Sequence, residues 1–192
     1  MEFIDKSTIR LDKVINELDR FVVKFTKILE KHTDYVIVSG YVSILFGRSR
    51  STEDVDVFIK EVNKEKFNLL CSDLIENGFW CLNTSNVDEM YKYLMDDLAI
   101  RFALKNETIP NFEVKVAKDR LAKETFSDRI TVITKLSEVY VSSLEKQIAF
   151  KKYYLKSDKD LEDAKHIEEV FGEKIDFKKI DDYKRLIENE KT

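Results

Sequence analysis

Two aspartates separated by one apolar residue are the strongest chemical signal in this sequence. Asp54 and Asp56 flank Val55, and the apolar residues Val57 and Ile59 continue the alternation typical of a β-strand. Side chains two residues apart in a strand share a face, so both carboxylates are expected to lie together. A bound Mg²⁺ would hold two such like charges, because it prefers oxygen ligands and shares them with substrate phosphates. Acidic residues number 37 of 192, so the pair alone is also explained as part of a solvated acidic face.

Residues suited to binding a phosphate precede the acidic pair. Ser39-Gly40 comes where an apolar run over 35–38 ends and a short helix is predicted over 42–46. Backbone amides at the start of a helix attract phosphate, and a glycine lets a ligand approach the backbone closely. The polar loop that follows adds cations and a hydroxyl group: Arg48, Arg50 and Thr52. Each residue taken singly is explained by a turn or a surface loop, but together they predict a phosphate site facing a metal site.

This stretch resembles the signature of the nucleotidyltransferase (polymerase beta-like) superfamily, which is a small-residue pair, a spacer and an Asp-x-Asp between hydrophobic residues. Serine stands at position 39, where many members have glycine. The run from Gly47 to Asp56 looks like the G-x-x-R-x-T-x-D-h-D form of the abortive-infection (AbiEii-type) nucleotidyltransferase toxins and their uncharacterised archaeal and bacterial relatives. The resemblance implies metal ligation and catalysis by Asp54 and Asp56. It also implies a set of nucleotide-binding residues: Ser39, Gly40, Arg48, Arg50 and Thr52.

The resemblance extends to the C-terminal part of the chain. The segments 145–151 and 157–163 look like the E-x-x-I-x-x-K and K-D-x-x-D segments of those relatives, in which a lysine and an aspartate reach the active site. By position these are Lys151 and Asp160, with Asp163 as the weaker alternative. A charged amphipathic helical hairpin explains the same residues without catalysis.

The family also carries a third carboxylate on a neighbouring strand. Glu113 is the candidate, because it alternates with apolar residues over 112–117. Ordinary strand alternation explains it equally well, and Asp96 and Asp97 are weaker rivals that precede a strand.

The surrounding periodicity predicts an α/β (α+β) fold, a small mixed sheet flanked by helices and followed by a C-terminal helical part. Predicted strands cover 35–38, 55–59, 79–82, 98–104, 112–117 and 129–133. Predicted helices cover 7–31, 42–46, 64–77 and 87–94, and the chain is expected to be helical after 140, with helix starts at Ser142, at Ser157 or Asp158, and at Asp176. We expect a nucleotidyltransferase core over 1–138 and a helical region over 139–192 packed on it.

Composition excludes several classes of protein. The 33 basic and 37 acidic residues nearly cancel, which disfavours a strongly basic nucleic-acid wrapper. No apolar run approaches the ~20 residues that a membrane span needs. Two cysteines and two histidines support neither a disulfide framework nor a zinc site. We therefore expect a cytoplasmic protein that does not bind a membrane.

The predicted activity is Mg²⁺-dependent transfer of a nucleoside monophosphate from an NTP, ATP among them, with Mn²⁺ as an alternative metal. The acceptor stays open between an RNA end such as that of tRNA, a protein hydroxyl and a small molecule. So does the choice between a stand-alone enzyme and a toxin paired with an antitoxin protein. The rival from another class is a module that binds nucleotide or nucleic acid on the same fold without catalysis.

Overall fold

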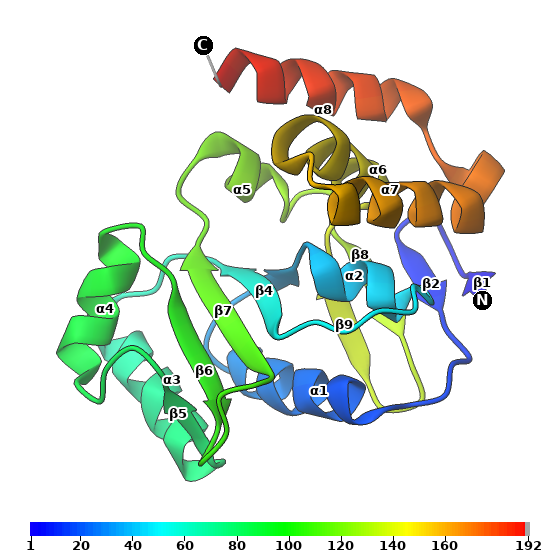
Figure 1. Ribbon diagram of the computed structural model, residues 1–192. Coiled ribbons are helices and arrows are strands. Elements are labelled where there is room, and N and C mark those ends of the chain that lie inside the picture. The colour runs from blue at the N-terminus through cyan, green and yellow to red at the C-terminus, as the bar shows by residue number, and fades with distance from the viewer. Residues whose placement is uncertain (191–192) are drawn as a thin grey trace.

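The strands form one mixed sheet of nine strands in the order β1-β2-β8-β9-β3-β4-β7-β6-β5. The computed structural model describes residues 1–190 of the chain (Figure 1). The strands are β1 (Glu2–Phe3), β2 (Thr8–Arg10), β3 (Tyr35–Ile37), β4 (Asp54–Ile59), β5 (Phe79–Cys81), β6 (Ile100–Leu104), β7 (Asn111–Val116), β8 (Ile130–Ile133) and β9 (Glu138–Val141). Three neighbouring pairs, β2/β8, β9/β3 and β4/β7, are parallel and the others are antiparallel. The predicted fold class is confirmed.

The helices cover both faces of this sheet (Figure 1). They are α1 (Glu17–Leu29), α2 (Gly40–Leu45), α3 (Lys64–Glu76), α4 (Val87–Met95), α5 (Arg120–Glu124), α6 (Leu144–Ala149), the π-helical segment η1 (Phe150–Leu155), α7 (Asp158–Phe171), the short 3-10 turn η2 (Gly172–Lys174) and α8 (Phe177–Glu190). On one face, Phe25 of α1 stacks on Phe112 of β7 with ring centroids 4.0 Å apart. Alternation along β7 therefore turns Glu113 and Lys115 to the opposite face, where the C-terminal helices lie.

The predicted helix over 7–31 is wrong in its first third. Thr8–Arg10 is a strand that pairs in parallel with β8, and the apolar residue Val14, which falls within the predicted helix, is 90% exposed. The helix begins only at Glu17, because Asn16 and Asp19 form a capping box at its start. The apolar spacing upstream of Asn16 came from a strand and a loop rather than from a helical face.

Three short strands, β1, β2 and β9, were not predicted. Strand β9 (Glu138–Val141) lies between β8 and β3 where a helical segment was expected to begin, so the sheet extends three residues past the domain boundary predicted after 138. The following helix α6 is capped by Ser143, not by Ser142. The predicted helix starts at Ser157 and Asp176 are confirmed, since each side chain accepts backbone N–H bonds there. None of the helices within residues 1–190 has the length and apolarity of a membrane span.

Candidate active site

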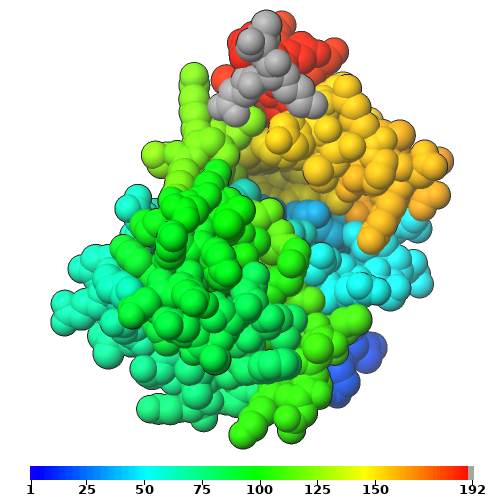
Figure 2. All heavy atoms as spheres, turned by 60° about the vertical axis from the view of Figure 1, so that its left-hand side comes forward, coloured from blue at the N-terminus to red at the C-terminus, as the bar shows by residue number. Residues whose placement is uncertain are grey.

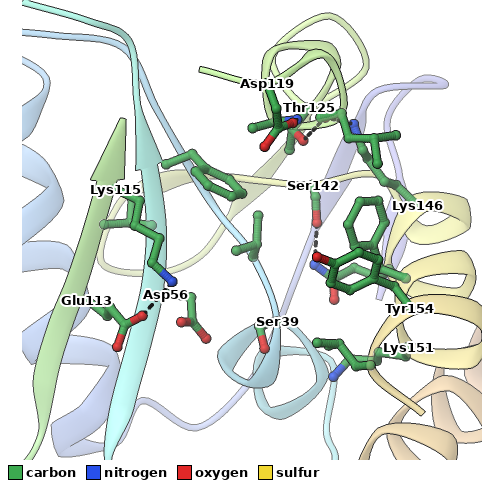
Figure 3. A pocket seen from close by; sticks show the side chains of 18 of the residues that line it. Ser39, Asp56, Glu113, Lys115, Asp119, Thr125, Ser142, Lys146, Lys151 and Tyr154 are labelled. Atoms are coloured by element: carbon green, nitrogen blue, oxygen red, sulfur yellow. Dashed lines mark hydrogen bonds and ion pairs between the residues drawn. The ribbon is translucent and has the colours of Figure 1, made fainter. Parts of the chain in front are cut away.

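Three carboxylates lie on the face of the sheet opposite α1. In β4, Asp54 and Asp56 lie half-buried on this face, while the alternating apolar residues are buried on the other. Strand β7 runs parallel to β4, and its Glu113 is the register partner of Asp56. Neighbouring strands lie about 4.8 Å apart, so these two carboxyl groups are adjacent (Figure 3). Of the rivals to Glu113, Asp96 lies at the C-terminal end of α4, and Asp97 lines the same pocket as Asp56 and Glu113.

The negative charge of Asp56 is only partly compensated by the protein. Burial, followed by the charges of Asp54 and Glu113, raises the pKa of Asp56 to about 6. A hydrogen bond from Ser39 and the charge of Lys115 act in the opposite direction without cancelling this rise. A cation placed beside Asp56 would therefore bind to a group that the protein leaves short of positive charge.

Glu113, in contrast, is neutralised by protein cations. Its carboxylate pairs with Lys115 Nζ at 2.8 Å and with the Arg101 guanidinium. Although burial favours the protonated acid, these two cations lower the pKa of Glu113. Glu113 therefore stays ionised, and it holds Lys115 at the edge of the pocket.

The donor set fits Mg²⁺ that arrives with a substrate. Within residues 1–190, no three His, Cys, Asp or Glu side chains converge closely enough to hold a metal ion by themselves. Mg²⁺ is usually held by only one or two carboxylates and completes its shell with water and substrate phosphate. Asp54 and Asp56 meet that requirement, and Thr52 Oγ1 stabilises Asp54 by donating to its backbone oxygen at 3.0 Å and its Oδ1 at 3.3 Å.

Ser39 occupies the turn between β3 and α2, as predicted. Its backbone has φ 61° and ψ −132°, a conformation that glycine adopts freely and other residues adopt at a cost of about 1–3 kcal/mol. The serine hydroxyl faces Asp56, and its hydrogen bond lowers the pKa of that carboxyl. Glycine at this position would adopt the same backbone conformation without that cost.

A side chain packs closely on Gly40. A Cβ atom at this position would overlap the guanidinium group of Arg50. The approach of a phosphate to the Gly40 backbone stays a prediction, and in this structure the Arg50 guanidinium lies over Gly40.

The basic residues of the 47–53 loop are bound to α7. Arg50 forms a two-pronged ion pair with Asp163, Nε to Oδ1 at 3.1 Å and Nη2 to Oδ2 at 2.9 Å. Lys151 Nζ contacts the same carboxylate at 2.9 Å and Asp160 Oδ1 at 3.3 Å. Burial would raise the pKa of Asp163, but Arg50 and Lys151 lower it below its ordinary value. Asp163 is thus the centre of this cluster, a role that the sequence placed first on Asp160.

Arg48 reaches the same helix. Its guanidinium pairs with Glu162 and lies 3.6 Å from Asp163, while its buried Nε has no hydrogen-bond partner. The sequence named Asp163 only as the weaker alternative to Asp160, from the resemblance to the K-D-x-x-D segment.

A pocket of about 400 Å³ lies between the carboxylates and the C-terminal helices. Figure 2 shows the hollow between the green central segments and the yellow helices. Four of the predicted site residues line it: Ser39, Asp56, Glu113 and Lys151. The other predicted residues lie outside that lining: Gly40, Arg48, Arg50, Thr52, Asp54 and Asp160. The sequence did not single out several polar lining residues, among them Lys115, Lys146 and Gln147.

The fold is shared with nucleotidyltransferases of known structure. The solution structure of the antibiotic-resistance factor ANT(2'')-Ia aligns with this chain at a TM-score of 0.57 and 12% identity, over 90% of this chain and 91% of that one. Its complex with adenylyl-2''-tobramycin aligns equally well, over 90% and 98% of the two chains. An antigenic nucleotidyltransferase-like protein from Paracoccidioides brasiliensis aligns with a TM-score of 0.51 and 18% identity, over 88% and 86%.

No family model and no curated protein matches the sequence. At these identities the likeness concerns the fold, and the resemblance to the abortive-infection enzymes stays a prediction. The chain has the nucleotidyltransferase fold, with Asp56 and Glu113 side by side in its central pocket.

Proposed function

We propose that this protein is a Mg²⁺-dependent nucleotidyltransferase, which moves a nucleoside monophosphate from an NTP to an acceptor hydroxyl and releases pyrophosphate. The observation that carries the proposal is the pairing of Asp56 with Glu113 in one pocket that Lys151 also lines. Transfer of this kind depends mainly on positioning and on stabilising negative charge. A pocket that combines carboxylates for a metal with buried cations supplies both.

Each residue has a role in this proposal. Asp54 and Asp56 would hold Mg²⁺, which offsets the charge of the triphosphate and makes the acceptor hydroxyl easier to deprotonate. The backbone of Ser39 and Gly40 would bind the terminal phosphates. Lys151 would stabilise charge that develops on the transferred phosphate. The lowered pKa of Glu113 makes this carboxylate a poor proton acceptor. We therefore assign it the role of keeping Lys115 in the pocket through their ion pair.

Arg48 and Arg50 would act in one of two ways. They either leave α7 to meet the triphosphate, or they hold Asp163 and so position Lys151. Their present contacts favour the second role. Asp160 would then assist by holding the same lysine.

The acceptor is proposed from the same three classes as before: an RNA end, a protein hydroxyl or a small molecule. One of the aligned structures holds an adenylylated aminoglycoside, which favours none of them for this chain. A cytoplasmic location, where NTPs and RNA are available, fits the activity. A role as a toxin with an antitoxin partner is tested by comparing growth of cells that express the wild type or the Asp54→Asn, Asp56→Asn variant.

The deciding experiment is transfer of label. The protein is incubated with each α-labelled NTP, Mg²⁺ and, in separate reactions, total RNA, cell protein and an aminoglycoside mixture. Label in one acceptor class, absent with the Asp54→Asn, Asp56→Asn variant or with chelator, supports the proposal. Tight NTP binding without transfer to any acceptor would instead favour the non-catalytic binding module.

A further inference from the structure

The pocket continues past the carboxylates to a second end that the proposed reaction does not use. Asp119, Thr125 and Lys146 gather there, on the far side of the pocket from Asp56 in Figure 3. Along α6 and η1, the five steps of backbone from Lys146 to Lys151 rise by roughly 7.5 Å at 1.5 Å per residue. This separation is comparable to the length of a nucleoside.

Lys146 is the unusual residue at this end. Only 3% of its surface is exposed, and Nζ donates a hydrogen bond to the backbone carbonyl of Leu121 at 2.6 Å. That carbonyl is also satisfied by Thr125 Oγ1 at 3.1 Å. An ammonium group has three N–H donors, so donors remain beyond the one bound to Leu121. The ring of Tyr183 lies 5.3 Å from Nζ and covers another side of it.

Burying this ammonium group is costly for the fold. Burial lowers the pKa of Lys146 to about 8, even though the charges of Asp128, Glu124 and Asp119 act to raise it. A buried cation that is this poorly compensated destabilises the folded state. Stability therefore does not explain a lysine here, whereas a ligand that accepts its hydrogen bonds does.

The walls beside Lys146 are apolar. Val116, Leu121 and Phe150 line the pocket, and Tyr154 packs on Phe150 with ring centroids 5.5 Å apart. A flat molecule with apolar faces and a polar edge suits such a space. A polycationic acceptor does not, because it would meet the buried charge of Lys146.

We propose that this end of the pocket is a nucleobase subsite, and that Lys146 selects a base carrying a carbonyl oxygen. The inference rests on the proposed nucleotidyltransferase function and deepens it. Uracil, cytosine and guanine each carry a carbonyl oxygen. Adenine carries an amino group at the edge position where guanine has its carbonyl oxygen, and it accepts hydrogen bonds only at ring nitrogens. UTP, CTP and GTP are therefore expected to bind better than ATP.

The test is calorimetric binding of Mg²⁺ complexes of the four NTPs, each as a non-hydrolysable analogue, without an acceptor. For the wild type we expect at least one of UTP, CTP and GTP to bind about 10- to 100-fold more tightly than ATP, the range for a hydrogen bond to a charged group. In Lys146→Met this preference disappears and the ATP affinity changes little. Lys146→Gln, which keeps an amide donor, retains part of the preference. Lys165→Met, at a lysine 75% exposed on α7, is the matched control and leaves it unchanged.

Three results would overturn the nucleobase subsite and leave the proposed function standing. They are equal affinity of the wild type for all four analogues, an equal loss for all four in Lys146→Met, and a loss of the same preference in the Lys165→Met control. Failure of the wild type to bind any NTP would reject the proposed function itself. Thermal unfolding verifies that both Lys146 variants are folded.

Discussion

Replacing Lys151 by methionine separates a catalytic role from a structural one. Its ammonium group is 1% exposed and bonded to Asp163 at 2.9 Å. The variant leaves Asp163 with the two hydrogen bonds from Arg50, so the carboxylate is not left unpaired. Lys151 also contacts Asp160 at 3.3 Å, and that carboxylate keeps its hydrogen bond from the Ser157 hydroxyl. The expected loss is therefore about 2 kcal/mol, within the range for a hydrogen bond to a charged group, rather than the 3–5 kcal/mol of an orphaned buried charge.

A loss of this size lowers Tm by roughly 4–8 °C in a domain of this length. The variant stays folded at an assay temperature well below its transition, so activity is measured on folded protein. If Lys151 contacts the transferred phosphate, the rate falls by about 10²- to 10³-fold. That is far more than incomplete folding would cause.

The assay combines urea unfolding with initial rates of label transfer. Lys152→Ala is the control, because Lys152 pairs with Glu168 and its side chain is 32% exposed; we expect a change below about 1 kcal/mol and an unaltered rate. A Lys151→Met protein that is destabilised as calculated yet transfers label at the wild-type rate would refute the catalytic role. Lys151 would then only join η1 to α7.

Three further predictions concern the metal site, the glycine and the buried lysine. The Asp54→Asn, Asp56→Asn double variant should lose transfer while its Tm stays equal or rises, because like-charge repulsion is relieved; a residual rate near wild type would argue against the metal site. Gly40→Val should displace the Arg50 guanidinium and so weaken both NTP affinity and stability, measured by calorimetry and urea unfolding. Unchanged affinity in folded protein would leave Gly40 as a packing residue only. Lys146→Met should be more stable than wild type at pH 7, by at most about 3 kcal/mol, because the folded protein holds the Lys146 proton with a pKa of about 8 instead of 10.5. The wild type gains stability relative to this variant as pH rises from 8 to 10.5, since the unfolded chain then binds more protons than the folded chain does. A difference in unfolding free energy between the two proteins that stays constant with pH in urea titrations would contradict this.

The sequence by itself determined the local features of the site. Alternation placed Asp54 and Asp56 on one face of a strand, and the Ser39-Gly40 turn between strand and helix is where it was predicted. Such features depend on a few adjacent residues, whose periodicity and capping act over short range. The same locality explains the error at the N-terminus, where the strand Thr8–Arg10 exists because it pairs with β8, more than 100 residues away.

Only the tertiary structure decided which distant residues meet. The partnership of Asp56 with Glu113 depends on the register of two parallel strands, with β5 and β6 lying between them in the chain. The ion pair between Asp163 and Arg50 joins residues 113 positions apart in the sequence, and it depends on how α7 packs beside α2. Burial also determined the pKa values of the enclosed groups. Desolvation changes a pKa only once the fold has enclosed the group, as it has enclosed Lys146.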